Sequence, residues 1–204
     1  KFLGVVKADA YGHGSVQVSR LLQESGADYL AVSSIDEAVE LRHNGITMPV
    51  LILGHTPKEE VSELIKNNIT QAVTCRAKAL EYSEEAVKCG GTLKIHIKVD
   101  TGMSRLGFPV AKESVEEILK IGRLVYTDCE GMFTHFSKAD ETDKTTTLEQ
   151  IRAFLWMKEH LAAEGMEFTY YHCANSASII DMPKLGMNLE RAGISTYGLY
   201  PSDE

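Results

Sequence analysis

The sequence predicts one α/β domain over residues 1–204, a TIM-like (β/α)8 barrel. Apolar, β-branched runs of strand length alternate with longer helical patterns about eight times along the chain. Strands that alternate with helices pair in parallel through crossover helices. Eight such units favour a closed barrel, whereas five or six would favour an open sheet. No linker or low-complexity stretch divides the 204 residues, which suit a single domain.

The first four strand–helix units are each delimited by a turn or a capping signal. We expect strands at residues 2–6, 29–32, 49–53 and 69–74, and helices at 16–24, 35–44, 57–67 and 77–88. Ser34 and Glu37 form a capping box, in which the hydroxyl accepts an early helix N–H and the carboxylate reaches back to the start of the helix. Thr56 and Glu59 form another, with Pro57 at the first helical position.

The second half of the chain continues the alternation. We expect strands at residues 93–99, 130–134, 168–173 and 188–192, and helices at 112–122, 148–164 and 176–181. Within the strand at 93–99, Lys94, His96 and Lys98 alternate with apolar residues. Because successive strand residues face opposite sides, the polar face is expected to point into the barrel and the apolar face to pack on the helices.

Composition excludes several classes of function. The net charge of −8 and the pI of about 5.4 argue against a nucleic-acid surface. The four cysteines lack CxxC spacing, and His13, His135 and His172 lack metal-ligand spacing, so we expect free thiols in a reducing cytoplasm and no metal. No signal peptide is visible and no apolar run is long enough to cross a bilayer, so we expect no membrane segment.

Lys7 is the first candidate for chemistry. It directly follows an apolar strand, and active sites of such barrels lie at the carboxyl ends of the strands. Burial at the barrel mouth disfavours the ammonium form, which makes a lysine available as a nucleophile, a base or a Schiff-base partner for an aldehyde. Read alone, a lysine at a strand end is more often a surface lysine whose ammonium group reaches the solvent.

Four motifs then carry a resemblance to a known family. Residues 7–14, Lys-Ala-Asp-Ala-Tyr-Gly-His-Gly, resemble the cofactor-lysine motif of bacterial alanine racemases, which are pyridoxal-phosphate enzymes with a fold-type III barrel. Residues 98–107, 134–136, and 172–176 together with 191–194, agree in order and spacing. The resemblance covers essentially the whole chain and implies pyridoxal 5′-phosphate as cofactor.

The resemblance implies four catalytic residues. Lys7 would form the Schiff base with the cofactor and act as one of two bases. Arg105 would contact the phenolic oxygen of the cofactor and the substrate carboxylate, and Arg191 would donate to the pyridine nitrogen. Because arginine has no acceptor, that ring nitrogen must be unprotonated. His135 would support Arg191.

The resemblance also implies a cofactor-binding set beyond the catalytic residues. Tyr11, Ser176, Gly193 and Ile194 would surround the phosphate, which agrees with the phosphate sites that barrels carry at their last strands. Leu53 and Asn175 complete the set. Read alone, Ser176 would be an ordinary helix N-cap.

Lys98 is a candidate for modification. An interior lysine needs a partner or a change of charge state. The family often carries a carbamylated lysine at this place, paired with the arginine at Arg105, and carbamylation turns the cation into an anion. The alternative is that Lys98 stays unmodified and pairs with Asp100 or another carboxylate.

The expected function is the interconversion of L- and D-alanine, which supplies D-alanine for peptidoglycan. In the family a helix precedes the first strand, a β-rich domain follows the barrel, and the second base is a tyrosine from the partner subunit of a homodimer. We therefore expect the 204-residue chain alone to bind cofactor with little racemase activity. The alternatives are a serine racemase of the vancomycin-resistance type and a non-catalytic carrier of pyridoxal phosphate.

Overall fold

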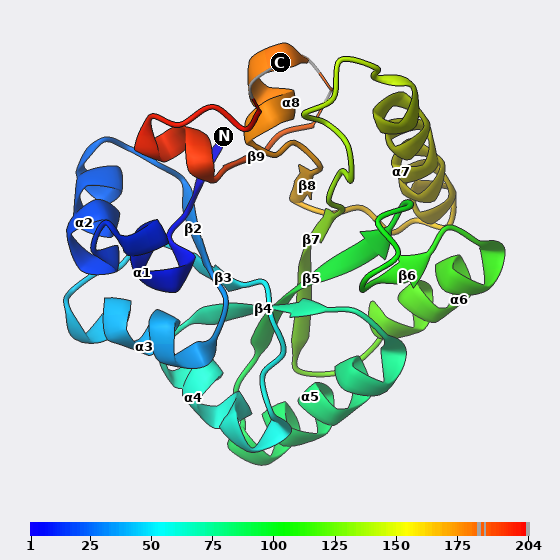
Figure 1. Cartoon of the computed structure of the whole chain (residues 1–204). Coiled ribbons are helices and arrows are strands. Elements are labelled where there is room, and N and C mark those ends of the chain that lie inside the picture. Colours follow the sequence, from blue (N-terminus) through cyan, green and yellow to red (C-terminus); the bar gives the residue numbers. More distant parts are fainter. Residues whose placement is uncertain (183–184, 186, 203–204) are drawn as a thin grey trace.

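The computed structural model describes residues 1–182, 185 and 187–202, and it has the barrel architecture that the sequence predicts (Figure 1). The strands run parallel in the order β8-β7-β5-β4-β3-β2-β1-β9, with β6 paired to β5. The strands are β1 (Phe2–Val5), β2 (Tyr29–Val32), β3 (Val50–Ile52), β4 (Ile69–Val73), β5 (Leu93–Asp100), β6 (Phe108–Pro109), β7 (Thr127–Phe133), β8 (Tyr170–His172) and β9 (Glu190–Ala192).

Helices surround the strands (Figure 1). They are α1 (Lys7–Gly12), α2 (Ser15–Glu24), α3 (Ile35–His43), η1 (Lys58–Glu60), α4 (Val61–Lys66), α5 (Arg76–Cys89), α6 (Lys112–Ile121), α7 (Thr145–Ala163), α8 (Ser176–Asp181) and η2 (Ile194–Tyr197). Every predicted strand and helix is present, with ends that differ by a few residues, whereas α1, β6 and η2 were not predicted. None of the helices in the described ranges is long and apolar enough to cross a membrane.

The ring closes between β8 and β9 through irregular contacts. The Leu189 N–H donates to the Tyr171 carbonyl at 3.3 Å, and the Arg191 N–H donates to the Ala174 carbonyl at 3.1 Å. The Tyr171 N–H in turn donates to the side chain of Asn188 at 2.8 Å. These bonds hold the last strand beside the loop after β8, where the predicted phosphate residues lie.

The barrel interior has an apolar side and a polar side. Strands β1 to β3 contribute Leu3, Val5, Ala31 and Leu51 to a small inner apolar cluster. The polar side comes from β5, β8 and β9, and contains the buried residues His96, Lys98, His172 and Arg191. The apolar residues of β5 belong to the outer core against the helices, so the predicted alternation along β5 is confirmed.

The two predicted capping boxes have different outcomes. Ser34 caps α3 by accepting the Glu37 N–H at 3.4 Å, as predicted. The Glu37 carboxylate instead accepts the N–H of Ser33 at 2.6 Å and that of Ala8 at 2.8 Å. The Thr56 box is wrong, because its buried hydroxyl donates to the side chain of Gln71 at 2.6 Å and η1 has no side-chain cap.

Candidate functional site

A cavity of about 310 Å³ opens at the carboxyl ends of the strands. It brings together all the site residues predicted from the sequence except Lys98 and Arg105. The predicted residues that line it are Lys7, Tyr11, Leu53, His135, Asn175, Ser176, Arg191, Gly193 and Ile194. They follow or end β1, β3, β7, β8 and β9, so the parallel strands bring distant segments of the chain to one edge.

Lys7 enters the cavity at the start of a left-handed turn. Residues 8–11 all have φ between 51° and 53°, a conformation that costs L-amino acids roughly 1–2 kcal/mol each. The turn is anchored by the Ala8 N–H, which donates to Glu37, and by the Ser15 N–H, which donates to Asp9 at 2.7 Å. Strained backbone of this kind concentrates at functional sites, and here it carries Lys7 and Tyr11.

Arg191 has four of its five N–H groups in hydrogen bonds. Nη1 donates to Nδ1 of His172 at 3.0 Å and to the His172 carbonyl at 2.9 Å. Nη2 donates to the Thr134 carbonyl at 2.6 Å, with the Cys173 carbonyl at 3.2 Å and His135 Nδ1 at 3.4 Å. Among the described residues none accepts the Nε–H, and Arg191 lines the cavity. The side chain therefore keeps one donor for a ligand.

The pKa of His135 reflects the positive charges near the cavity. Burial, followed by the charges of Arg191, Lys98, Arg105 and Lys7, lowers the pKa of His135 to about 3. The imidazole is therefore neutral at pH 7 and can accept from Arg191 through Nδ1. All four cations act on this one ring, and we call Lys7, Lys98, Arg105 and Arg191 the cavity cations, although only Lys7 and Arg191 line the cavity.

Lys98 is buried without a carboxylate partner in the part of the chain that the structure describes. Its Nζ lies 5.7 Å from the ring centre of Phe133, and burial together with Arg105 and Arg191 lowers the pKa of Lys98 to about 8. The Asp100 carboxylate instead accepts the backbone N–H groups of Gly102, Ser104 and Arg105. The alternative that Lys98 forms an ion pair with Asp100 is therefore wrong. The Arg105 side chain is exposed beside this loop.

The part of the cavity lined by Tyr11, Ser176 and Gly193 has small residues and hydroxyl groups. A Cβ added to Gly193 would lie 3.0 Å from the Tyr11 hydroxyl, so this glycine allows the phenol to approach the backbone. The Ser176 hydroxyl accepts the N–H of Gly193 at 3.0 Å and that of Ser195 at 3.2 Å. The cap of α8 is Asn175, which accepts the Ser178 N–H, so the alternative of Ser176 as the N-cap is wrong.

Several residues of the site were not predicted. The lining also includes Val5, Met103, Phe136, Ser137, Asp140, Ala177 and Pro201. Met103 lies inside the motif at 98–107, which was a usable signal, whereas nothing in the sequence marked Ser137 or Asp140. The half-buried carboxylate of Glu130, below the cavity on β7, was also missed.

Sequence comparisons show the family to which the chain belongs. The family described as "Alanine racemase, N-terminal domain" matches residues 1–201. The chain is 47% identical over its whole length to the alanine racemase of Clostridium tetani and covers 53% of that protein. It is 48% identical, over 98% of its length, to the alanine racemase of Methanococcus maripaludis and covers 54% of it. The chain thus spans about half the length of the curated relatives it matches.

Solved structures give the same relationship for the fold. The chain is similar to alanine racemase of Clostridium difficile 630 in complex with cycloserine, with a TM-score of 0.98 at 47% identity, and covers 56% of that chain. It is similar to alanine racemase from Bacillus anthracis with bound L-Ala-P, with a TM-score of 0.90 at 35% identity, and covers 52% of that chain. All of the present chain is covered in both cases.

Proposed function

The chain belongs to the alanine racemase family through the N-terminal domain of that family, and from this premise we propose that residues 1–204 form the cofactor-binding barrel of a pyridoxal-phosphate-dependent racemase. The proposed reaction is the interconversion of L- and D-alanine. The observation that carries the proposal is the cavity itself, which joins a lysine, an arginine with a free N–H and a hydroxyl-rich end. Pyridoxal phosphate has an aldehyde, a ring nitrogen and a phosphate, and these three groups match the lysine, the arginine N–H and the hydroxyl-rich end in turn.

The residues present fit pyridoxal phosphate. Lys7 would hold the aldehyde carbon, and the Nε–H of Arg191 would donate to the ring nitrogen. Tyr11, Ser176 and the backbone of Gly193 and Ile194 would surround the phosphate, at the glycine where a Cβ would crowd the phenol. Leu53 and Asn175 line the walls, and Arg105 would reach the phenolic oxygen and the substrate carboxylate. When bound, the cofactor acidifies the Cα–H of the amino acid.

Racemisation requires proton removal on one face of the carbon and delivery on the other, so two bases are needed. Lys7 is the base that this chain supplies. We propose that the second base comes from the partner subunit of a homodimer, through a part of the protein that this half-length match does not include. Burial lowers the pKa of Arg191 only to about 10, so it stays a protonated donor and keeps the ring nitrogen an unprotonated acceptor. This restrains carbanion chemistry beyond proton exchange.

We further propose that Lys98 is carbamylated. Carbon dioxide reacts with the neutral amine, and a pKa of about 8 gives Lys98 an appreciable neutral fraction at pH 7 to 8. The resulting anion would face Arg105 and Arg191, whose charges act on Lys98 now. The modification would thus replace repulsion between cations by attraction.

The remaining parts of the proposal concern the cell. The protein would act in the cytoplasm on a free amino acid and supply D-alanine for the cell wall. Alanine is favoured over serine as substrate because the curated relatives at 47 and 48% identity are named alanine racemases.

The test uses the protein at its natural length. Addition of pyridoxal phosphate should produce the visible absorption band of the lysine-bound cofactor, and Lys7→Ala should abolish it. The matched control is Lys78→Ala, an exchange of a lysine on α5 outside the cavity. An unchanged band in Lys7→Ala would overturn the assignment. Comparing turnover of alanine and serine then tests the substrate, and a band without turnover of either would support a cofactor carrier instead.

A further inference from the structure

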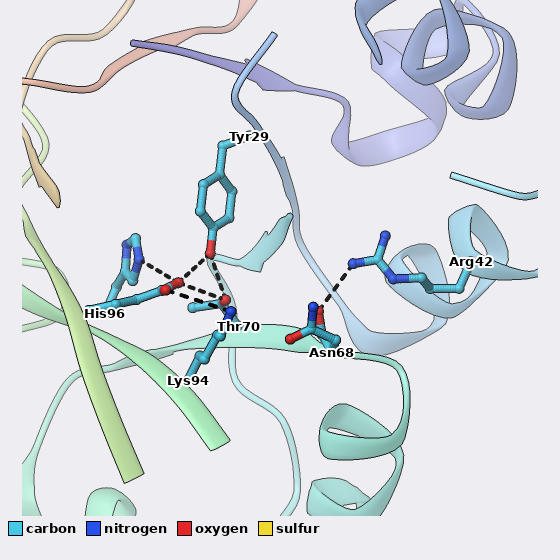
Figure 2. A network of polar contacts seen from close by, with 7 residues as sticks. Tyr29, Arg42, Asn68, Thr70, Lys94 and His96 are labelled. Atoms are coloured by element: carbon cyan, nitrogen blue, oxygen red, sulfur yellow. Dashed lines mark hydrogen bonds and ion pairs between the residues drawn. The ribbon is translucent and has the colours of Figure 1, made fainter. Parts of the chain in front are cut away.

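A half-buried carboxylate, that of Glu130, lies below the cavity, at the side of the barrel away from Lys7. Oε1 of Glu130 accepts the Tyr29 hydroxyl at 2.6 Å and the Thr70 hydroxyl at 3.1 Å, and it lies 3.3 Å from Nε2 of His96. Figure 2 shows Tyr29, Thr70 and His96 converging from three strands. Burial acts to raise the pKa of Glu130, but hydrogen bonds from His96 and Tyr29 bring it to about 2. The group is therefore ionised and can only accept.

Two histidines connect this carboxylate to Arg191. Nδ1 of His96 lies 2.9 Å from Nε2 of His172, and Nδ1 of His172 lies 3.0 Å from Nη1 of Arg191. Both imidazoles have no exposed surface. Glu130, His96, His172 and Arg191 thus form an unbroken hydrogen-bonded row through the barrel, which we call the relay.

The chemistry of the two end groups fixes the proton on each ring. Arginine only donates, so Nδ1 of His172 must accept, and its proton is on Nε2. That N–H donates to Nδ1 of His96, whose proton is then on Nε2 and donates to Glu130. A doubly protonated ring would set two N–H groups against each other at one contact. Burial lowers the pKa of both histidines, in agreement with neutral rings.

We propose that Glu130 is a positioning residue for Arg191, acting through His96 and His172. The acceptor-only carboxylate of Glu130, at the end of the relay away from Arg191, makes every hydrogen bond of the relay point toward it. Nη1 of Arg191 therefore donates to His172. With Nη2 held by the Thr134 carbonyl, the guanidinium is fixed on both sides and the Nε–H is left for the cavity. The use of that N–H toward a pyridine nitrogen rests on the proposed function, whereas the proton arrangement of the relay rests only on the hydrogen bonds among its four residues.

An amide at position 130 both donates and accepts, so it no longer imposes one direction on the relay as an acceptor-only carboxylate does. Its NH2 group can donate to Nε2 of His96, which moves the His96 proton to Nδ1 and directs it at the Nε2–H of His172. Relief of that conflict moves the His172 proton to Nδ1, directly against Nη1 of Arg191. The disturbance would therefore reach the cavity without any substitution of a residue that lines it.

The experiment compares Glu130→Gln with Thr70→Val in the protein at its natural length. Thr70→Val is the matched control, because it removes a partly buried hydrogen bond to the same carboxylate and leaves the His96 contact in place. Ring ¹⁵N NMR without cofactor is expected to find the Nε2–H form at both buried histidines in the wild type and in Thr70→Val, and its loss in Glu130→Gln. Turnover in Glu130→Gln should fall on the order of tenfold, the effect typical of removing the hydrogen-bond partner that orients a functional histidine.

Three results would overturn the proposal. An Nδ1–H form of His172 in the wild type would do so without any variant, so the test stands even where Glu130→Gln fails to fold. Unchanged histidine signals in a folded Glu130→Gln would do so as well, as would an equal change in Thr70→Val. Glu130→Asp keeps an acceptor-only group, so this variant should show the same Nε2–H signals as the wild type. The NMR readout needs no cofactor, so its outcome is separate from that of Lys7→Ala.

Discussion

Gly131 offers a test of how rigidly the relay is held. This glycine lies on β7 against the His96 ring, and a Cβ added there would lie 2.5 Å from Nδ1 and 2.6 Å from Cε1 and Cγ. The ring has no exposed surface, and both of its nitrogens are engaged, with His172 and with Glu130. Gly131→Ala therefore forces His96 to give up its contacts or β7 to move.

The size of the effect follows from these contacts. Overpacking a well-packed core costs about 1–3 kcal/mol. Loss of the two hydrogen bonds of His96 adds about 1 kcal/mol each. We expect Gly131→Ala to lower the free energy of unfolding by about 3 kcal/mol or more.

Gly4→Ala is the matched control on β1. Its Cβ would lie equally close, 2.5 Å, to Cδ1 of Leu22, but this atom is the far end of a flexible side chain. Alanine in a strand also gains about 0.5–1 kcal/mol over glycine, because glycine loses more backbone freedom on folding. The net effect of Gly4→Ala should therefore stay within about 1 kcal/mol.

Urea unfolding of both variants measures the difference through their midpoints at equal slope. Equal midpoints for Gly131→Ala and Gly4→Ala would refute the reasoning, because His96 would then be free to move. A changed slope would mean that the substitution had altered the compactness of one of the two states instead.

Two further predictions concern groups around the cavity. Glu37→Gln removes one of the two carboxylate oxygens that accept the N–H groups of Ala8 and Ser33. Thermal unfolding should therefore show a loss of about 1–2 kcal/mol in stability, and titration with the cofactor should show a weaker affinity. Glu40→Gln, on the exposed face of α3, is the control and should change neither quantity. Burial lowers the pKa of Lys98 from 10.5 to about 8, so the unfolded state binds more protons between these values and stability rises with pH. In bicarbonate-free buffer Lys98→Met should be the more stable form at pH 7, by about 3 kcal/mol, and the difference should vanish toward pH 10.5. Added bicarbonate should stabilise the wild type and leave Lys98→Met unchanged, and the opposite pattern would contradict carbamylation.

The fold was predictable because the hydrophobic pattern and the turn residues agree along the chain. The strand-end rule then placed Lys7 and Arg191 at the same edge before any contact was known. Local signals failed where a distant partner competed for the same group. Thr56 has the sequence context of a cap, but Gln71 on β4 offers its hydroxyl a buried acceptor that only the folded chain brings near. The left-handed turn after Lys7 was not predictable either, since alanine and tyrosine disfavour positive φ and aspartate adopts it only occasionally, as a single residue.

Glu130 shows why the relay could not be predicted. Strict alternation along β7 would place Glu130 on the same face as Met132, which packs in the outer core. The register with β5 shifts between Ile95 and His96: Cys129 pairs with Ile95 and Gly131 pairs with His96. Glu130 is the extra residue of this bulge, and bulges re-aim side chains. Its carboxylate thereby contacts Tyr29 and His96. Regular alternation of side chains along β7 would have turned it toward the outer core instead.

The distribution of charge connects the stability of the barrel to its ligand. In the part of the chain that the structure describes, no ion pair includes any of the cavity cations, although surface lysines and arginines are paired many times. Two of the cavity cations, Lys98 and Arg191, are buried, and a buried cation without a counter-charge costs stability. An anionic ligand bound at the cavity would supply the missing charge and would stabilise the fold by about 2.7 kcal/mol at a hundred times its Kd. Binding and folding of this barrel therefore depend on the same side chains.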